Sequence, residues 1–285
     1  MMYNLLDMTK ETKLLASDLD GTLFYPKRPR RFIARKNKKF LDRFVSEGNK
    51  VVFVTGRSPN FANKVVNFIG HDIDVIGMNG AYTIVDGKVK DEHFLDFPIG
   101  KVLYELNFLF PSLGQMLISR KHPLLISIPP MGKIMELFYR IYYLLQGEYA
   151  EEFLISNEEF VKEIDSKEVY KIMIFFGLSK RGVKLAAKAN SYLRKNYAGQ
   201  FESSWTGGFI EITPMNSSKA QGIEKYINEK GFKHENVYVV GDSGNDISMF
   251  NAYHDNSFCL KHAHKKVKKY AKTIIRRFHH LEKYM

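Results

Sequence analysis

Short and almost uninterrupted apolar runs alternate with amphipathic segments toward both ends of the chain. Runs of this kind, ended by glycine or an acid, are typical of strands buried on both faces of a parallel sheet. Four of them stand at residues 13–17, 50–55, 73–78 and 236–240. Apolar residues recur at helical spacing between them, and Ser58-Pro59 and Ser218 supply helix-start signals. The alternation predicts an α/β fold with a doubly wound, Rossmann-like parallel sheet.

The pattern changes in the middle of the chain. Asp86-Gly87 and Gly207-Gly208 each separate two short alternating segments, and therefore predict β-hairpins. The block between them mixes helical periodicity with isolated strands and is rich in aromatic residues and proline. We therefore predict a core domain and an inserted α+β domain, with the core at 1–84 and 206–285 and the insertion at 85–205.

Polar residues follow several of the predicted strands directly. Asp18, Thr55 and Asn79 come at the carboxyl ends of the first three runs, and open α/β sheets bind their ligands outside these ends. Asp20 lies two residues after Asp18, and residues two apart on an extended segment face the same way. The two carboxylates are therefore expected to point toward the same bound ligand.

An acidic cluster at this edge needs a cation. Asp242 and Asp246 follow the run at 236–240 and add two acids to Asp18 and Asp20. Adjacent carboxylates repel one another unless a cation neutralises them. A cluster that offers only oxygen ligands suits Mg²⁺, a hard cation that is often shared with phosphate. We therefore predict Mg²⁺ as the cofactor.

Groups suited to a phosphate stand at neighbouring positions. Thr22 and Thr55 offer hydroxyls, and Gly56 allows backbone N–H groups to come close to an anion. Lys219, at a predicted helix start, supplies a positive charge. A carboxylate nucleophile beside a metal and a lysine is suited to phosphoryl transfer through an aspartyl-phosphate.

Four segments in this order resemble a known enzyme family. They are DLDGTL at 18–23, VTGR at 54–57, SSK at 217–219 and GDSGNDISMF at 241–250. Together with MNGAY at 78–82 and EITP at 211–214, they resemble hydrolases of the haloacid dehalogenase (HAD) superfamily. The similarity is to the Cof-like group, whose large α/β cap (C2-type) is inserted after the third strand. The resemblance extends over the whole chain and implies that 85–205 is a cap that selects the substrate.

The resemblance also implies a role for each motif residue. Asp18 would be the nucleophile and Asp20 the general acid and base. Phosphate contacts would come from Thr55, Gly56, Lys219 and Asn245. The metal would be held by Asp18, the backbone carbonyl of Asp20 and Asp242, with Asp246 acting through water. The retained acid at position 20 implies hydrolysis of a monoester.

Two segments depart from the family pattern. Lys261-His262-Ala263 stands where relatives usually carry an Asn-Ala pair. The usual acidic-Gly-Val segment near the end is absent, and the chain instead carries Arg276, Arg277, His279 and His280. We expect the basic segment from His264 onward to be helical.

Composition restricts the partners. The chain has 285 residues, 43 Lys and Arg against 31 Asp and Glu, and a formal net charge of +12, which favours anionic partners. Its single cysteine, Cys259, cannot form an internal disulfide, which fits a reducing cytoplasm. No uncharged apolar run is long enough for a membrane span. We expect a cytoplasmic monomer or weak homodimer that binds a small phosphorylated metabolite, but no membrane and no specific nucleic acid.

The sequence therefore predicts a Mg²⁺-dependent phosphatase, a HAD-type phosphoric monoester hydrolase. Sugar phosphates are the default substrates, and the resemblance allows pyridoxal phosphate or flavin mononucleotide-type compounds. One alternative is a phosphomutase of the same superfamily. Another is a basic nucleic-acid-binding protein on an inactive HAD scaffold, which the net charge favours and the acidic cluster opposes, since four acids would repel a phosphate backbone.

Overall fold

The chain folds into two compact units. The computed structural model describes residues 12–27, 33–129 and 133–285. The core unit consists of Met1–Gly56, Ala62–Lys90 and Ser218–Met285, and the cap unit of Arg57–Phe61 and Asp91–Ser217. Each unit is built on its own sheet.

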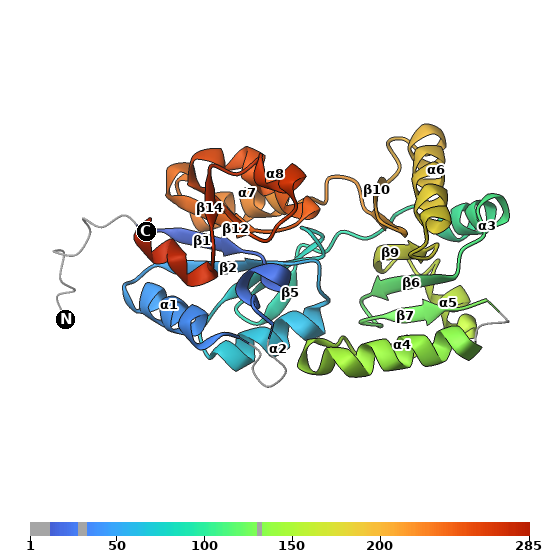
Figure 1. The fold of residues 1–285 in the computed structure, drawn as a ribbon, viewed down its shortest axis with the longest axis horizontal. Helices are drawn as coiled ribbons and strands as arrows, with labels where there is room; N and C mark the ends of the chain where they lie inside the picture. Colours follow the sequence, from blue (N-terminus) through green and yellow to red (C-terminus); the bar gives the residue numbers. More distant parts are fainter. Residues whose placement is uncertain (1–11, 28–32, 130–132) are drawn as a thin grey trace. The chain divides into compact units, whose positions relative to one another are not determined.

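An eight-stranded sheet forms the centre of the core unit (Figure 1). Its strands are β1 (Leu14–Ser17), β2 (Lys50–Val54), β3 (Asp74–Gly77), β4 (Tyr82–Val85), β5 (Lys88–Lys90), β12 (Val237–Gly241), β13 (Ser257–Leu260) and β14 (Thr273–Ile275). Their order is β14-β13-β12-β1-β2-β3-β4-β5. The strands from β14 to β3 pair in parallel, whereas β4 and β5 are antiparallel. From β1, the strands β2 and β3 follow on one side, and β12, β13 and β14 follow on the other. The strand order therefore reverses between β1 and β12, the point at which open α/β sheets bind ligands.

Helices cover both faces of this sheet. They are α1 (Arg35–Ser46), α2 (Pro59–Ile69), α7 (Lys219–Lys230), α8 (Ile247–Ala252) and α9 (Lys265–Lys268). Figure 1 shows α7 and α8 on one side of β1 and β2, with α1 and α2 on the other. Ile223 of α7 and Met249 of α8 pack with Ala16 of β1 and Val239 of β12 in one buried cluster. Burial on both faces explains why the strands are continuous apolar runs.

The cap unit contains a six-stranded sheet with four helices. Its strands are β6 (Gly114–Ser119), β7 (Leu125–Ser127), β8 (Leu154–Ile155), β9 (Val169–Phe175), β10 (Glu202–Thr206) and β11 (Phe209–Thr213), in the order β10-β11-β9-β6-β7-β8. The helices are α3 (Ile99–Leu109), α4 (Lys133–Gln146), α5 (Asn157–Glu163) and α6 (Lys180–Asn196). Val102, Phe160 and Leu193, from α3, α5 and α6, share one core with Ile172 of β9.

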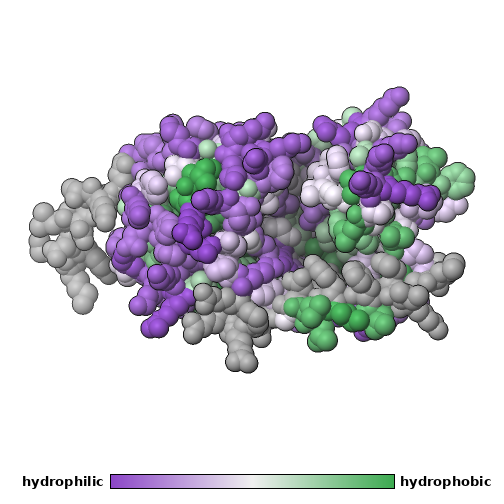
Figure 2. Space-filling model, viewed as in Figure 1, coloured by the Kyte–Doolittle hydropathy of each residue, from purple (hydrophilic) through white to green (hydrophobic). Residues whose placement is uncertain are grey.

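Helix α4 carries apolar residues on an exposed side. Leu137, Ile141, Leu144 and Leu145 are exposed, and Figure 2 shows apolar side chains gathered along this part of the cap unit. The helix also buries Tyr139, so the apolar side chains described for it are divided between core and surface. Among the described residues, no helix combines the length and the apolar character that crossing a bilayer requires.

Both predicted hairpins are confirmed, but each one lies wholly within one unit, whereas the expected domain boundaries would divide it between two. Asp86-Gly87 joins β4 to β5, and β4 pairs with β3 in the core sheet. The hairpin of β10 and β11 pairs with β9 in the cap sheet. The boundaries expected after residues 84 and 205 would each cut through a strand. The units instead change after Lys90 and Ser217, because an antiparallel hairpin can extend the edge of a parallel sheet.

The expectation of a helical tail after His264 is wrong. Only Lys265–Lys268 is α-helical; Thr273–Ile275 forms edge strand β14 and Phe278–Lys283 a 3₁₀ segment. Thr273 and Ile275 are β-branched and favour a strand. Pairing with β13 satisfies their backbone groups in parallel register.

A close approach inside the core sheet gives a stability test. Tyr82 lies opposite Gly77 in the ladder, and a Cβ atom on Gly77 would lie 1.8 Å from its ring. Tyr82 is fully buried, so moving its ring would disturb the close-packed core around it. Gly77→Ala should therefore lower the free energy of unfolding by about 2–3 kcal/mol in urea denaturation.

The matched control is Gly244→Ala. A Cβ at Gly244 meets nothing within 4 Å, so its unfolding free energy should change by less than about 0.5 kcal/mol. Equal stability of the Gly77 and Gly244 variants would contradict the packing described for this ladder.

Candidate active site

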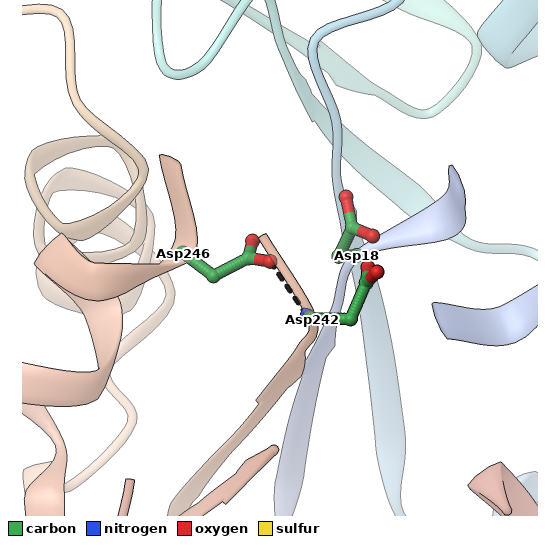
Figure 3. Close-up of side chains that lie close together, drawn as sticks. All are labelled: Asp18, Asp242 and Asp246. Carbon is green, nitrogen blue, oxygen red and sulfur yellow. Dashed lines mark hydrogen bonds between the residues drawn. The ribbon is translucent and has the colours of Figure 1, made fainter. Parts of the chain in front are cut away.

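Two acids meet where β1 and β12 end. The strands pair in parallel with Ser17 opposite Val240, and the Asp18 N–H donates to the Val240 carbonyl at 3.0 Å. Asp242 directly follows β12. Figure 3 shows the carboxylates of Asp18 and Asp242 side by side at the strand ends. The sheet register therefore brings together two residues that lie more than two hundred positions apart.

A third acid comes from the turn before α8. Asp246 is fully buried, and its Oδ2 accepts hydrogen bonds from the backbone N–H groups of Asp242 and Ser243, each at 2.8 Å. The first of these bonds is drawn in Figure 3. One oxygen from each of Asp18, Asp242 and Asp246 lies within 4.8 Å of the other two. The three carboxylates thus form one compact group.

A buried lysine stands against this group. Lys219 is the first residue of α7, which Ser218 caps by accepting a hydrogen bond from the Gln221 N–H. Its Nζ donates to Asp18 Oδ1 at 2.6 Å and to Asp246 Oδ1 at 2.7 Å. Burial by itself would lower the pKa of Lys219, but the two carboxylates outweigh it and raise the pKa above its usual value. The side chain therefore carries a positive charge although no part of it is exposed.

Negative charge still exceeds positive charge in the cluster. Burial raises the pKa of Asp18 well above its usual value, with Lys219 opposing the rise and Asp246 adding to it. Burial and the nearby Asp246 likewise raise the pKa of Asp242, against hydrogen bonds from Thr22 and His262. One ammonium group therefore does not neutralise three carboxylates.

The cluster fits a hard divalent cation. Within the described parts of the chain, the buried Oδ2 of Asp18 has no hydrogen-bond partner, so it has a lone pair to offer. The donor atoms are all carboxylate oxygens, the ligands that Mg²⁺ prefers. A bound cation would also relieve the excess negative charge.

The turn after β1 is shaped around Asp242. Thr22 donates its hydroxyl hydrogen to Asp242 Oδ1 at 3.0 Å. Gly21 has a φ of +78°, and a Cβ atom there would lie 2.4 Å from Asp242 Oδ2. Only glycine combines this backbone conformation with such a close approach. The glycine of the first motif therefore makes room for an acid from the last one.

The carboxylate of Asp20 lies outside the group of three. Strand β1 ends at Ser17, and residues 19–23 form a tight turn, so the extended geometry expected to align Asp20 with Asp18 does not continue. The Asp20 side chain is 36% exposed, and its Oδ1 lies 4.0 Å from Lys27 Nζ. A partly solvated acid next to a buried one is suited to exchange protons.

The remaining predicted residues gather around Asn79. Thr55 is buried at the end of β2, and its carbonyl accepts a hydrogen bond from the Asn79 N–H at 3.0 Å. Asn245 Nδ2 donates to Asn79 Oδ1, also at 3.0 Å. A Cβ atom on Gly56 would lie 3.4 Å from the same oxygen. Asn79 thus joins the second and fourth motifs, and its φ of +59° is a conformation that asparagine tolerates well.

Sequence reasoning gave no role to His262, which reaches the acidic cluster. Its Nε2 lies 3.2 Å from Asp242 Oδ2, and its ring stacks on Tyr25 with 3.8 Å between centroids. His262 follows β13, the neighbour of β12 in the sheet. The departure from the family pattern at this position, combined with the strand order, was the available signal.

Comparisons with known proteins agree with this geometry. The phosphatase YwtE of Bacillus subtilis (strain 168), named for 5-amino-6-(5-phospho-D-ribitylamino)uracil, is 25% identical over 84% of each chain. Pyridoxal phosphate phosphatase YbhA of Escherichia coli (strain K12) is 25% identical over 85% of each chain. Hydrolysis of phosphoric monoesters is the activity that these names share, in agreement with the predicted enzyme class.

The fold and the family are shown independently of these names. The solved structure of the HAD subclass IIB sugar phosphatase BT4131 matches with a TM-score of 0.71 and 22% identity, over 92% of this chain and 93% of that one. This match confirms the predicted fold class of an α/β core with an inserted cap. The family model described as haloacid dehalogenase-like hydrolase matches residues 15–279, and the chain therefore belongs to the haloacid dehalogenase-like hydrolases.

Proposed function

We propose that the protein is a Mg²⁺-dependent phosphatase that hydrolyses small phosphorylated metabolites, sugar phosphates above all, through an aspartyl-phosphate on Asp18. The observation that carries the proposal is the buried group of Asp18, Asp242 and Asp246 around the Lys219 ammonium. The names of the relatives support a phosphorylated small molecule as substrate. Location in the cytoplasm and a monomeric or weakly dimeric state remain predictions.

The proposed metal ligands are those of the acidic cluster. Asp18, Asp242 and the backbone carbonyl of Asp20 would hold Mg²⁺, and Asp246 would act through water. When bound, Mg²⁺ would neutralise charge on the phosphate oxygens and so reduce their repulsion by the carboxylates. The backbone N–H groups that bond Asp246 Oδ2 keep this acid in place.

Asp18 is the proposed nucleophile. Lys219 holds its Oδ1, which fixes the carboxylate for attack on phosphorus. The P–O bond to the leaving group breaks as the new bond to Asp18 forms, and Asp20 gives its proton to the leaving oxygen. Asp20 then removes a proton from water, which attacks the phosphorus and releases phosphate and the free Asp18 carboxylate. A carboxyl that lies apart from the buried cluster can perform both proton transfers.

The phosphate-binding residues surround this pair. Lys219 already touches the nucleophile and would offset charge on the transferring group. Asn245 is oriented by Asn79, which also holds the end of β2 at Thr55. These contacts would fix the phosphoryl group for attack in line with the leaving oxygen. A phosphomutase would share the first half of the reaction but return the phosphoryl group to a sugar.

The metal requirement is the first test. Excess chelator should abolish phosphatase activity on a panel of phosphorylated metabolites, and added Mg²⁺ should restore it, because phosphate cannot approach the unneutralised acids. Asp242→Ala should lower kcat by at least about a hundredfold even in saturating Mg²⁺. Asp255→Ala, which removes an exposed acid of the same unit, is the control. Full activity in chelator would rule out the proposed role of the metal.

The two acids of the first motif should separate in rapid-quench experiments. Asp18→Asn should stop formation of a hydroxylamine-labile phosphoryl-enzyme, because an amide is a far poorer nucleophile. Asp20→Asn should still form it from an aryl phosphate, whose leaving group needs little protonation, but should hydrolyse it slowly. The label should therefore accumulate in the Asp20 variant. Labelling of the Asp18 variant, or a label on Ser17 or Thr22, would show that another group is the nucleophile.

Lys219 should also be needed for stability. In chelator, Lys219→Met should lower the free energy of unfolding by about 3 kcal/mol, because it leaves buried carboxylates without a counter-charge. Adding Asp246→Asn should recover part of the loss by removing one of these carboxylates. Lys266→Met, at an exposed position, should change stability by less than about 0.5 kcal/mol. If urea denaturation found the Lys219 and Lys266 variants equally stable, the ion pairs would not hold the cluster together.

A further inference from the structure

A second site, lined by basic residues, lies in the core unit between the start of α1 and the C-terminal segment. It is a pocket of about 500 Å³, a volume in the range of small-molecule sites. Among the described residues that line it, none is acidic. The basic ones are Arg35, Lys36, Arg276, Arg277, His279 and His280. Neither the motifs nor the proposed reaction gives these residues a role.

The lysine and arginine side chains of the pocket lack carboxylate partners. No ion pair joins any of the four to an acid in the parts of the chain that the structure describes. The nearby Glu282 bonds Arg43 instead. Other cations of the core unit do pair, as Lys38 does with Asp42 and Lys272 with Asp255. Lysines such as Lys265 and Lys266 lie exposed on α9, so the feature that distinguishes the four pocket residues is that they line one concave site.

Helix α1 begins at this pocket, and the charges in its first turn are opposite to those that a helix N-terminus usually carries. The residue at its N-cap is Ala34, whose side chain cannot cap it, and its first turn has no acid. That turn carries Arg35 and Lys36, although the positive end of the helix dipole disfavours cations. The free N–H groups of a helix start are donors for an anion. A bound anion would accept hydrogen bonds from these N–H groups and would compensate the repulsion between the helix dipole and the two cations. The arrangement therefore favours an anion at this position.

Two histidines, His279 and His280, complete the lining of the pocket. Asn37 donates its Nδ2 hydrogens to the carbonyls of Leu23 and Tyr25, so its Oδ1 accepts from His279 Nδ1 at 3.1 Å. Burial, followed by the surrounding cations, lowers the pKa of both His279 and His280. Their surroundings therefore resist a further positive charge, which an anion in the pocket would reverse.

The charge in the pocket selects the kind of anion. One phosphate group carries a charge of about −2 at most, whereas four Lys and Arg side chains line this pocket. A pocket of about 500 Å³ suits a small molecule, and a nucleic acid would need a basic track. We propose that the pocket binds a small molecule through a chain of two or three phosphate groups, as in a nucleoside triphosphate or inorganic tripolyphosphate.

This pocket is separated from the acidic cluster by a stacked row of side chains. The guanidinium of Arg277 lies 4.8 Å from the centroid of the Tyr25 ring, and His262 stacks on the same ring. His262 in turn contacts Asp242. Because chelator removes the metal that turnover would require, binding of polyphosphate in the pocket can be measured without turnover.

Isothermal titration with inorganic tripolyphosphate tests the proposal on the full chain. Chelator is included so that the metal-free acidic cluster repels the probe. One molecule should bind per chain, and orthophosphate should bind at least about tenfold more weakly. Arg35→Gln with Arg276→Gln should weaken tripolyphosphate binding at least about tenfold. The control, Lys265→Gln with Lys266→Gln, removes the same charge from exposed α9 positions and should change Kd less than about twofold.

A parallel titration with ATP identifies the source of the phosphate chain. Tighter binding of ATP than of tripolyphosphate supports a nucleotide, and equal binding supports an inorganic polyphosphate. No binding of either probe, or equal loss in the pocket and control variants, overturns the proposal. Tight binding of a single-stranded oligonucleotide alone, weakened by the pocket variant, overturns it in favour of nucleic acid. Arg35 and Arg276 are exposed, so thermal unfolding should show intact variants, and phosphatase assays test the proposed function separately.

Discussion

The repulsion between carboxylates that β1 and β12 bring together is the constraint on which the site depends. One oxygen from each of Asp18, Asp242 and Asp246 lies within 4.8 Å of the other two, and all three side chains are largely out of water. Lys219 compensates part of their charge from the start of α7, and backbone N–H groups hold Asp246. What remains is excess negative charge beside an oxygen without a partner, which is the condition under which a divalent cation binds most favourably.

The sequence was sufficient to predict a site residue where a local sequence pattern agreed with the general rules for parallel sheets. Continuous apolar runs mark buried parallel strands, and the first acid after a run must lie at the carboxyl edge. Asp18 and Asp242 were predictable for this reason, and Ser218 marked the helix start that places Lys219. His262 follows β13 and obeys the same rule, but its place was not predicted, because no local pattern states which strands are neighbours.

Other features depend on tertiary context that a pattern does not contain. The hairpins at Asp86-Gly87 and Gly207-Gly208 were predictable as turns, but the sheet that each one joins is decided by the register of its strands with β3 or β9. The direction of the Asp20 side chain depends on the turn at Gly21, which has a φ of +78° and lies close against Asp242. In the tail, helical propensity yields to pairing of β14 with the exposed edge of β13.

Net charge becomes informative only when the structure divides it into paired and unpaired parts. A value of +12 is compatible with nucleic acid, phosphorylated metabolites or a merely solvated surface. Cations such as Lys38 and Lys272 have carboxylates beside them and so reveal nothing about a ligand. The four Lys and Arg residues that line the pocket have no such partner among the residues that the structure describes, and they lie around one concave site. Mutual repulsion there costs folding free energy, so a basic pocket persists more readily where an anion offsets that cost. The departure of the tail from the family pattern thereby points to a ligand, since Arg276 and Arg277 complete this lining.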